Sequence, residues 1–196
     1  MLKRLIDIIL GLIGLLVFAV LFPFVSLFVL LDSGFPILIG LERISAGKKI
    51  KVWKFRSMVL DAQFRKSELQ ALNERSGGPF FKIKNDPRVT KSGRVLRKYL
   101  LDELPQFWNV LIGELSLVGP RPHEPGEVEK YPSQYKHIPH IKAGLTGLSQ
   151  VSGASELSAE REMELDNFYI KNFSLKLDFK IIFKTLFIFV FEHKGV

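Results

Sequence analysis

Apolar residues gather at the two ends of this chain and leave a polar, basic middle between them. The N-terminal run covers residues 8–31, which are 24 positions without a charge between Asp7 and Asp32. As a helix this run is about 36 Å long, which is enough to cross a bilayer. A cleaved signal peptide has an apolar core of only about 7–15 residues, followed by small residues at a cleavage site. Neither is found here, so we expect the helix to be retained.

Pro23 lies inside this apolar run. It lacks an N–H, so it frees the carbonyl of Ala19 and should kink or break the helix. Basic residues lie on both sides of the run: Lys3, Arg4, Arg43, Lys48, Lys49, Lys51, Lys54 and Arg56. The positive-inside tendency places both flanks on the cytoplasmic face, which a re-entrant helix satisfies and a simple span does not. We expect residues 1–40 to form a re-entrant helix–break–helix, with the Ser26 hydroxyl available to the freed backbone. A single span with a proline kink is the alternative.

The C-terminal apolar segment, residues 181–191, is too short to span about 30 Å as a helix. Lys176, Lys180 and Lys184 repeat at four-residue spacing and form a basic stripe beside a Phe, Ile and Leu face. This pattern favours a helix lying in the membrane interface, in contact with anionic lipid. A core helix with a solvated face is the alternative.

The polar middle predicts a compact, α-rich α/β domain. Its periodicity and turn residues predict a strand at 51–55 and helices at 60–73, 92–103, 105–111 and 158–168. In the second of these helices, Val95, Leu96, Tyr99 and Leu100 form a stripe that we expect to be buried. Residues 119–153 are rich in Pro and Gly and predict loops. The length of 196 residues fits one such domain with an appendage.

Composition excludes several classes of protein. The chain has no cysteine, which excludes a disulfide framework, a thiolate metal site and a cysteine nucleophile. Its four His residues lack metal-ligand spacing, which argues against a zinc enzyme. Hydrophobic residues make up 47% of the chain, which excludes disorder, and the net charge is +8. The aromatic residues do not alternate with the basic ones, so the charge favours an anionic, lipid-linked substrate over nucleic acid.

Asp102 and Glu103 are the strongest candidates for chemistry. They stand where the helix should end, because Pro105 disfavours a helical conformation of Leu104. Adjacent residues point about 100° apart, which suits a nucleophile beside a metal ligand better than a pair sharing a proton. The backbone N–H groups of the following helix favour an anion such as phosphate. The alternative is a surface Asp102 paired with Lys98.

Arginine and lysine residues supply the charge that a phosphate substrate needs. Pro120 and Pro122 fix Arg121 in a rigid loop, where its guanidinium could hold a phosphate with little loss of entropy. Arg88 and Lys54 add further cations.

Five ordered motifs resemble the bacterial sugar transferase family, the monotopic phosphoglycosyl transferases. They are Lys54-Phe55-Arg56-Ser57-Met58, Asp86-Pro87-Arg88-Val89-Thr90, Leu101-Asp102-Glu103-Leu104-Pro105-Gln106, Gly119-Pro120-Arg121-Pro122 and Gly144-Leu145-Thr146-Gly147. The resemblance runs from Lys3 to about Phe191 and is to the minimal catalytic form. It implies that residues 41–196 are the catalytic domain, on the cytoplasmic face of a bacterial inner membrane.

The resemblance also implies the reaction. Asp102 attacks the β-phosphorus of a UDP-sugar and expels UMP, and polyprenol (undecaprenyl) phosphate then captures the phosphosugar, the first membrane step in assembling a glycan such as exopolysaccharide or lipopolysaccharide. Both transfers need charge neutralisation, so Mg²⁺ is the expected cofactor, with Glu103 and Asp102 as its ligands. Substrate-side positions are Lys54, Arg97, Pro120, Arg121 and Pro122. Lys3 and Arg4 are expected to pair with Asp178 at the base of the membrane helix. A homodimer is left open.

The chain departs from the family pattern at a few positions. Phe22 stands before Pro23 where many members have Ser, and Lys142-Ala143 stands where many have Arg-Pro. Ala154 replaces an arginine expected near the substrate. These changes bear on sugar or phosphate recognition more than on the nucleophile. A rival hypothesis is a non-catalytic, membrane-anchored binding module, which predicts no dependence on UDP-sugars. A many-spanning transferase would need more apolar runs than this chain has.

Overall fold

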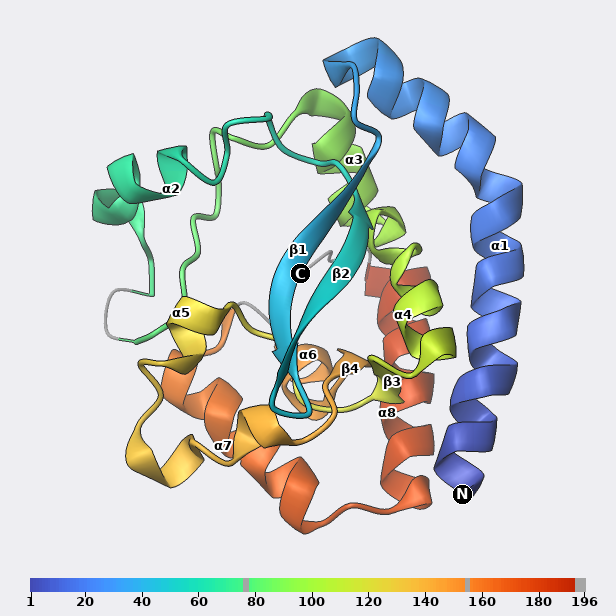
Figure 1. The fold of residues 1–196 in the computed structure, drawn as a ribbon, viewed down its shortest axis with the longest axis vertical. Helices are drawn as coiled ribbons and strands as arrows, with labels where there is room; N and C mark the ends of the chain where they lie inside the picture. The colour runs from blue at the N-terminus through green and yellow to red at the C-terminus, as the bar shows by residue number, and fades with distance from the viewer. Residues whose placement is uncertain (76–77, 154–155, 193–196) are drawn as a thin grey trace.

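The computed structural model describes residues 1–75, 78–153 and 156–192 and is rich in helix (Figure 1). Its α-helices are α1 (Leu2–Ser33), α2 (Arg65–Glu68), α3 (Lys91–Lys98), α4 (Gln106–Ile112), α5 (Pro125–Val128), α6 (Leu148–Val151), α7 (Ala159–Lys171) and α8 (Leu175–Phe187). Its strands are β1 (Leu38–Ser45), β2 (Lys48–Phe55), β3 (Ser116–Val118) and β4 (Gly144–Thr146). Shorter helical turns are η1 (Gln70–Leu72), η2 (Leu101–Glu103), η3 (Ser133–Tyr135), η4 (Ile138–His140) and η6 (Ile188–Glu192). The predicted α-rich α/β class is confirmed.

Helix α1 runs unbroken through Pro23. The helix bends toward the rest of the molecule in its second half (Figure 1), and the re-entrant arrangement stays a prediction. The Ser26 hydroxyl oxygen is buried without a hydrogen-bond partner, so it does not satisfy the freed backbone. On this part of the helix, Phe18 and Phe22 pack their rings against Phe55 of β2. Among the described helices, α1 is the one long and apolar enough to cross a membrane.

Polar contacts fix the first turns of α1. Lys3 Nζ lies 2.6 Å from Asp178 Oδ2 on α8, as predicted. Arg4 does not reach Asp178, because its guanidinium donates to the carbonyls of Val110 and Leu111, at 2.7 and 2.6 Å. These carbonyls lie at the end of α4, where a cation offsets the unpaired groups and the helix dipole. The prediction of an Arg4–Asp178 pair was therefore wrong.

Asp7 and Gly14 bring α1 against the body of the protein. The buried Asp7 carboxylate accepts from Leu117 N at 2.8 Å and from the Ser116 hydroxyl at 2.9 Å, both in β3. Gly14 faces the Phe107 ring of α4 so closely that an added Cβ would lie 2.3 Å from it. At this contact only glycine allows the two helices to approach.

Arg56 holds the far end of α1. Its side chain is only 2% exposed, and it donates to the carbonyls of Ser33, Gly34 and Phe35, at 2.5 to 2.7 Å. These carbonyls would otherwise be unpaired where the helix ends. Helix α1 is therefore held at both of its ends.

Strands β1 and β2 form a long antiparallel hairpin, with Leu38 opposite Phe55. Ala46 and Gly47 connect them, and both have positive φ, as a two-residue hairpin turn requires. The prediction at 51–55 captured part of β2 and missed β1. Strands β3 and β4 pair in parallel.

Two predicted helices differ in the structure. The region 60–73 contains only the short turns α2 and η1, and no residue of either is buried. Helix α3 ends at Lys98, because Leu100 adopts a left-handed conformation with φ of 51°. Leu104, expected to leave the helical region, is helical, so η2 leads through Pro105 into α4. Of the predicted buried stripe on α3, Leu96 is buried, whereas Val95 and Tyr99 are exposed.

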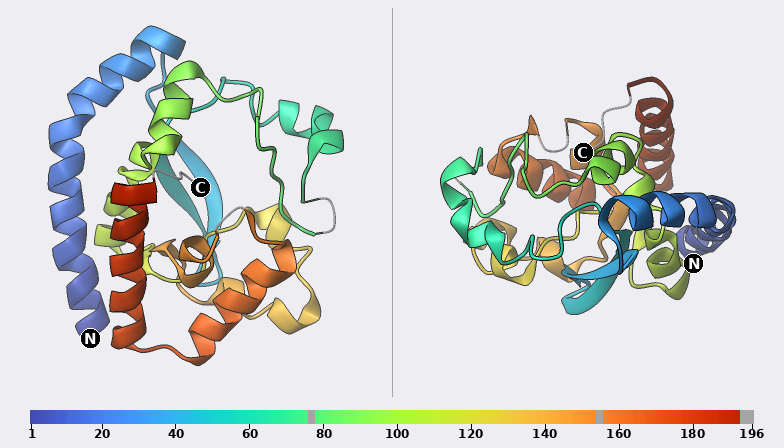
Figure 2. Two further views of the ribbon diagram at one scale, coloured as in Figure 1. Left: turned by 180° about the vertical axis from the view of Figure 1, so that it is seen from behind. Right: turned by 90° about the horizontal axis from the view of Figure 1, so that it is seen from above.

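The start of helix α8 lies beside the first turns of α1, where Asp178 meets Lys3 (Figure 2). Its basic stripe is exposed, at Lys176, Lys180 and Lys184. Large apolar side chains are also exposed on α8 and η6, including Phe183 at 69% and Phe191 at 68%. Many apolar residues along α1 are likewise exposed, including Leu16 at 68% and Phe24 at 70%. Apolar surface on this scale indicates membrane association.

Candidate active site

Asp102 and Glu103 lie in η2, between α3 and α4. The left-handed Leu100 turns the chain before them, and the helical Leu104 and Pro105 carry it on into α4. Asp102 is 5% exposed, and the Glu103 side chain is 20% exposed. The dipeptide therefore occupies a tight turn, with Asp102 behind Glu103 relative to solvent.

Lys54 of β2 faces both carboxylates. Its Nζ lies 2.5 Å from Glu103 Oε1 and 3.9 Å from Asp102 Oδ2. The alternative pairing of a surface Asp102 with Lys98 is wrong, because Asp102 is buried and its ion-pair partner among the described residues is Lys54. Lys98 instead lies over the Tyr99 ring.

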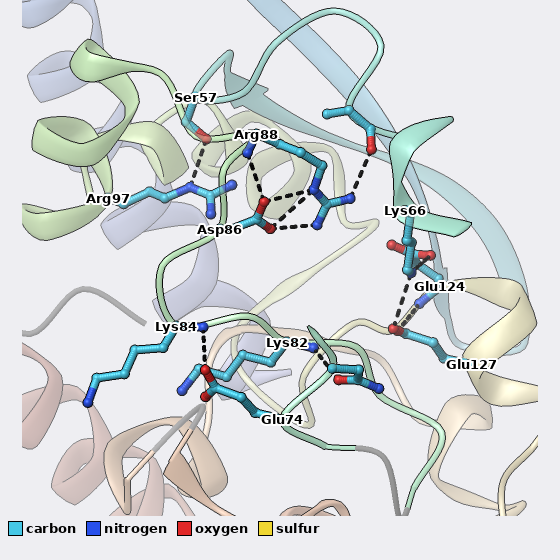
Figure 3. A network of polar contacts seen from close by, with 12 residues as sticks. Ser57, Lys66, Glu74, Lys82, Lys84, Asp86, Arg88, Arg97, Glu124 and Glu127 are labelled. Atoms are coloured by element: carbon cyan, nitrogen blue, oxygen red, sulfur yellow. Dashed lines mark hydrogen bonds and ion pairs between the residues drawn. The ribbon is translucent and has the colours of Figure 1, made fainter. Parts of the chain in front are cut away.

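Arg97 comes from the last turn of α3 and is half-buried. Its Nε donates to the Ser57 hydroxyl at 2.9 Å, and its side chain points toward Asp86 (Figure 3). Burial lowers the pKa of the Arg97 guanidinium, and the charges of Asp102 and Asp86 oppose this effect. Arg97 therefore interacts electrostatically with Asp102.

Arg88, which the sequence offered as a further cation for substrate, is committed elsewhere. Its guanidinium forms a bidentate pair with Asp86 and also donates to the Ala62 carbonyl at 2.9 Å (Figure 3). It is only 5% exposed. Arg88 therefore holds this loop together and does not present its charge to a ligand.

The local charges act differently on the two carboxyl groups. Burial raises the pKa of Asp102, and Glu103 adds to this, whereas Lys54 and Arg97 oppose it. Burial also acts to raise the pKa of Glu103, but Lys54 and Arg121 outweigh it, so that pKa lies below its usual value. Glu103 is thus the fixed negative charge of the pair. Asp102 is the carboxyl whose ionisation depends on neighbouring cations.

The loop of residues 119–123, here called the Arg121 loop, follows β3. Gly119 lies against the segment before β4, so closely that a Cβ on it would lie 2.7 Å from the Lys142 carbonyl oxygen. Pro120 is buried, and its carbonyl accepts from Gly144 N at 2.8 Å. Within the described part of the chain the Arg121 guanidinium has no hydrogen-bond or ion-pair partner, so its donors are available to a ligand.

Asp102 and Glu103 fit the kind of magnesium site in which substrate phosphates complete the coordination. No group of three or more His, Asp or Glu side chains within residues 1–75, 78–153 and 156–192 could hold a metal by itself. Protein Mg²⁺ sites commonly use one or two carboxylates and complete the coordination with substrate phosphates and water. Glu103 and Asp102 are a donor set of that kind.

Two of the residues that depart from the family pattern, Lys142 and Ala143, lie directly before β4. Lys142 is exposed, whereas Ala143 is buried and its N–H donates to Ser45 Oγ at 3.0 Å, which a proline could not do. Ala154 lies outside the described residues.

Sequence reasoning missed partners of the predicted residues. Ser57 and Asp86 orient the Arg97 region, and Glu162 and Asp166 of α7 contact the Arg121 loop. A signal for the last two was available: two carboxylates four residues apart fall on the same helix face as the apolar Met163. Carboxylates on a buried face need partners.

Comparison with known proteins gives one consistent result. A family model described as bacterial sugar transferase matches residues 1–192. The undecaprenyl-phosphate galactose phosphotransferase of Salmonella typhimurium is 40% identical over 188 residues, which are 94% of this chain and 39% of that protein. The UDP-glucose:undecaprenyl-phosphate glucose-1-phosphate transferase of Escherichia coli K12 is 40% identical, over 95% of this chain and 40% of that protein. The exopolysaccharide production protein ExoY of Rhizobium meliloti is 38% identical, over 95% and 84%. The chain spans 33% to 41% of the length of the first relatives.

Proposed function

The chain belongs to the bacterial sugar transferase family, and on this premise we propose that it transfers a sugar 1-phosphate from a UDP-sugar to undecaprenyl phosphate. Two of the relatives reported above are named for transfers to undecaprenyl phosphate. The observation that carries the proposal is the buried Asp102, which lies 3.9 Å from Lys54 and next to the ionised Glu103. A carboxylate in this setting is suited to act as a nucleophile.

In the first step a carboxylate oxygen of Asp102 attacks the β-phosphorus of the UDP-sugar. A new P–O bond forms, and the bond between that phosphorus and the bridging oxygen breaks. UMP leaves with the bridging oxygen and its electron pair. The product is a phosphosugar ester of Asp102, which is a mixed anhydride reactive enough for a second transfer.

In the second step a phosphate oxygen of undecaprenyl phosphate attacks the same phosphorus. The bond to Asp102 breaks, and the carboxylate is regenerated. The product is an undecaprenyl-diphosphate-sugar. Both transfers take place at the same phosphorus, so the same surrounding cations can stabilise the charge on the phosphoryl group in each step.

The surrounding cations neutralise these charges. Lys54 favours the ionised form of Asp102, and Arg97 adds to this effect. The Arg121 guanidinium, which has no hydrogen-bond or ion-pair partner among the described residues, is available to the nucleotide phosphates, in a loop fixed by Pro120 and Pro122. Glu103 and Asp102 would hold Mg²⁺ together with the diphosphate, and this ion neutralises charge on the diphosphate and the departing UMP when it is bound.

The long helix α1 and the exposed apolar face of α8 suit a substrate that sits in lipid. Basic residues flank both ends of α1, which favours a re-entrant arrangement with both ends on the cytoplasmic face. UDP-sugars are charged and water-soluble, so they would reach the site from that face. The product would be the first lipid-linked intermediate of a glycan such as exopolysaccharide.

Release of UMP tests the proposal. The detergent-solubilised protein is given a panel of UDP-sugars with Mg²⁺ and undecaprenyl phosphate, and UMP is measured for wild type and Asp102→Asn. Asp61→Asn is the matched control, because Asp61 is an exposed carboxylate that pairs with Arg65 on the surface. We expect UMP from at least one donor, its loss in Asp102→Asn, and no change in Asp61→Asn. No turnover with any donor would favour the binding-module hypothesis, and an active Asp102→Asn would refute the covalent mechanism.

A further inference from the structure

Helix α7 carries two buried carboxylates that the proposed reaction does not use. Glu162 and Asp166 are 3% and 2% exposed. They stand four residues apart and therefore project from one face of the helix, one turn from each other. Burying a carboxylate is unfavourable unless hydrogen bonds replace water, and an apolar residue would fill the same space more cheaply. Their contacts therefore need an explanation.

Both carboxylates contact the Arg121 loop. Asp166 Oδ2 accepts from the backbone N–H of Arg121 at 3.3 Å, and Asp166 Oδ1 accepts from the Ser149 hydroxyl at 2.7 Å. Glu162 Oε1 lies 3.1 Å from Nε2 of His123, two residues further along the loop. The loop is therefore held from α7 on both sides of its second proline.

The Arg121 side chain has no such support of its own. Its guanidinium lacks a hydrogen-bond or ion-pair partner within the described residues, so the direction in which it points depends on where its backbone is held. Asp166 is the side chain that contacts that backbone directly. Since a carboxylate has only acceptor oxygens, it can accept from the Arg121 N–H and from Ser149 at the same time.

We propose that Asp166 is a positioning residue for Arg121, which fixes the loop backbone so that the guanidinium meets the phosphates of the UDP-sugar. The inference rests on the proposed function for the role of Arg121. It assigns to α7, which is distant in sequence from Asp102, a part in nucleotide binding. It also explains why a carboxylate is buried at this position.

Two substitutions of Asp166 distinguish the effect of its hydrogen bonds from the effect of its negative charge. An asparagine at 166 can still accept from Arg121 N through its oxygen, while its amide donates to the rotatable Ser149 hydroxyl. Asp166→Asn should therefore keep the KM for the UDP-sugar near its wild-type value. Asp166→Ala loses both contacts, and we expect its KM for the UDP-sugar to rise about tenfold, as for the loss of one or two hydrogen bonds. The KM for undecaprenyl phosphate should not change.

A double substitution tests whether Asp166 acts through Arg121. If it does, Arg121→Ala and the double variant Arg121→Ala/Asp166→Ala should have the same KM for the UDP-sugar. Ala159→Gly is the matched control, because it weakens the same helix near its start without removing a contact to the loop. This variant should lower the melting temperature and leave both KM values unchanged.

Amide hydrogen exchange gives a readout that needs no turnover. In detergent, the peptide containing the Arg121 amide should exchange about tenfold faster in Asp166→Ala than in wild type, and at the wild-type rate in Asp166→Asn. If the wild type shows no UMP release with any donor, the proposed function fails, and this measurement still decides whether Asp166 fixes the loop. If the wild type is active but Asp166→Ala changes neither exchange nor KM, or if Asp166→Asn is as impaired as Asp166→Ala, the inference is overturned.

Discussion

The ion pair between Lys3 and Asp178 gives the sharpest prediction about how the membrane helix is held. The Lys3 side chain is 29% exposed and that of Asp178 is 7% exposed, and they meet at 2.6 Å. Lys3→Met leaves a buried carboxylate whose remaining side-chain partner among the described residues is the Tyr169 hydroxyl at 2.7 Å. Asp178→Asn leaves a half-buried ammonium that can turn to water. Removing the lysine should therefore destabilise the protein more than removing the aspartate.

The size of the effect follows from this asymmetry. Stranding a buried charge costs about 3–5 kcal/mol, and the partial exposure of Lys3 reduces this to about 2–3 kcal/mol for Lys3→Met. Asp178→Asn should cost about 1 kcal/mol, the worth of one hydrogen bond. For a chain of this size, 1 kcal/mol corresponds to a shift of about 2–4 °C in Tm.

Thermal unfolding in detergent, followed by intrinsic fluorescence, measures both variants and their combination. We expect Lys3→Met to lower Tm by about 5–10 °C, and Asp178→Asn by less. The double variant should be no worse than Lys3→Met, because the stranded charge is gone. A larger loss in Asp178→Asn, or additive losses in the double variant, would refute the reasoning.

Three further predictions concern charge and topology. Lys54→Met should raise the pKa of Asp102, because the charge of Lys54 lowers that pKa. The acid limb of the kcat/KM profile should therefore move to higher pH in Lys54→Met and stay in place in Lys54→Arg. Burial raises the pKa of Asp166 from 3.8 to about 7, so the folded state binds the proton more tightly than the unfolded state and loses stability as pH rises through that range. Asp166→Asn should therefore raise Tm over wild type at pH 8 by more than at pH 5, as a thermal scan at each pH would show. The chain has no native cysteine, so the single variants Leu2→Cys and Lys48→Cys can each be labelled with an impermeant maleimide. Both variants should react only from the cytoplasmic side. Labelling of the two variants from opposite sides would establish a simple span.

The local sequence pattern identified the long helix, the start of α4 and the candidate dipeptide, but it missed the shape of the chain around them. Residues 60–73 have a helical pattern without a surface to cover, and short helices in water need tertiary packing to form. Strand β1 has an irregular pattern because both of its faces are partly exposed. The left-handed Leu100 has no sequence signature, since leucine is not a residue that favours positive φ.

The candidate site illustrates the same limit. Asp102 and Glu103 are adjacent in sequence, so their motif was visible. Lys54 comes from a strand 48 residues earlier than Asp102, and only the resemblance to a family brought the two together before the structure was known. Arg88 was mistaken for a ligand-binding cation because nothing in the sequence distinguishes an arginine paired with Asp86 from a free one.

The way in which α1 is attached bears on how freely the sequence around it can drift. Arg4 and Arg56 donate to main-chain carbonyls, and Asp7 accepts a main-chain N–H. Every amino acid supplies a carbonyl, so the receiving positions can change identity while the attachment persists. A saturation mutagenesis screen scored by folded yield should therefore tolerate most residues at the exposed Phe35 and few at Arg56. Sequence variation would then be free at the positions that contribute main-chain groups to these contacts and confined at the positions that contribute side chains.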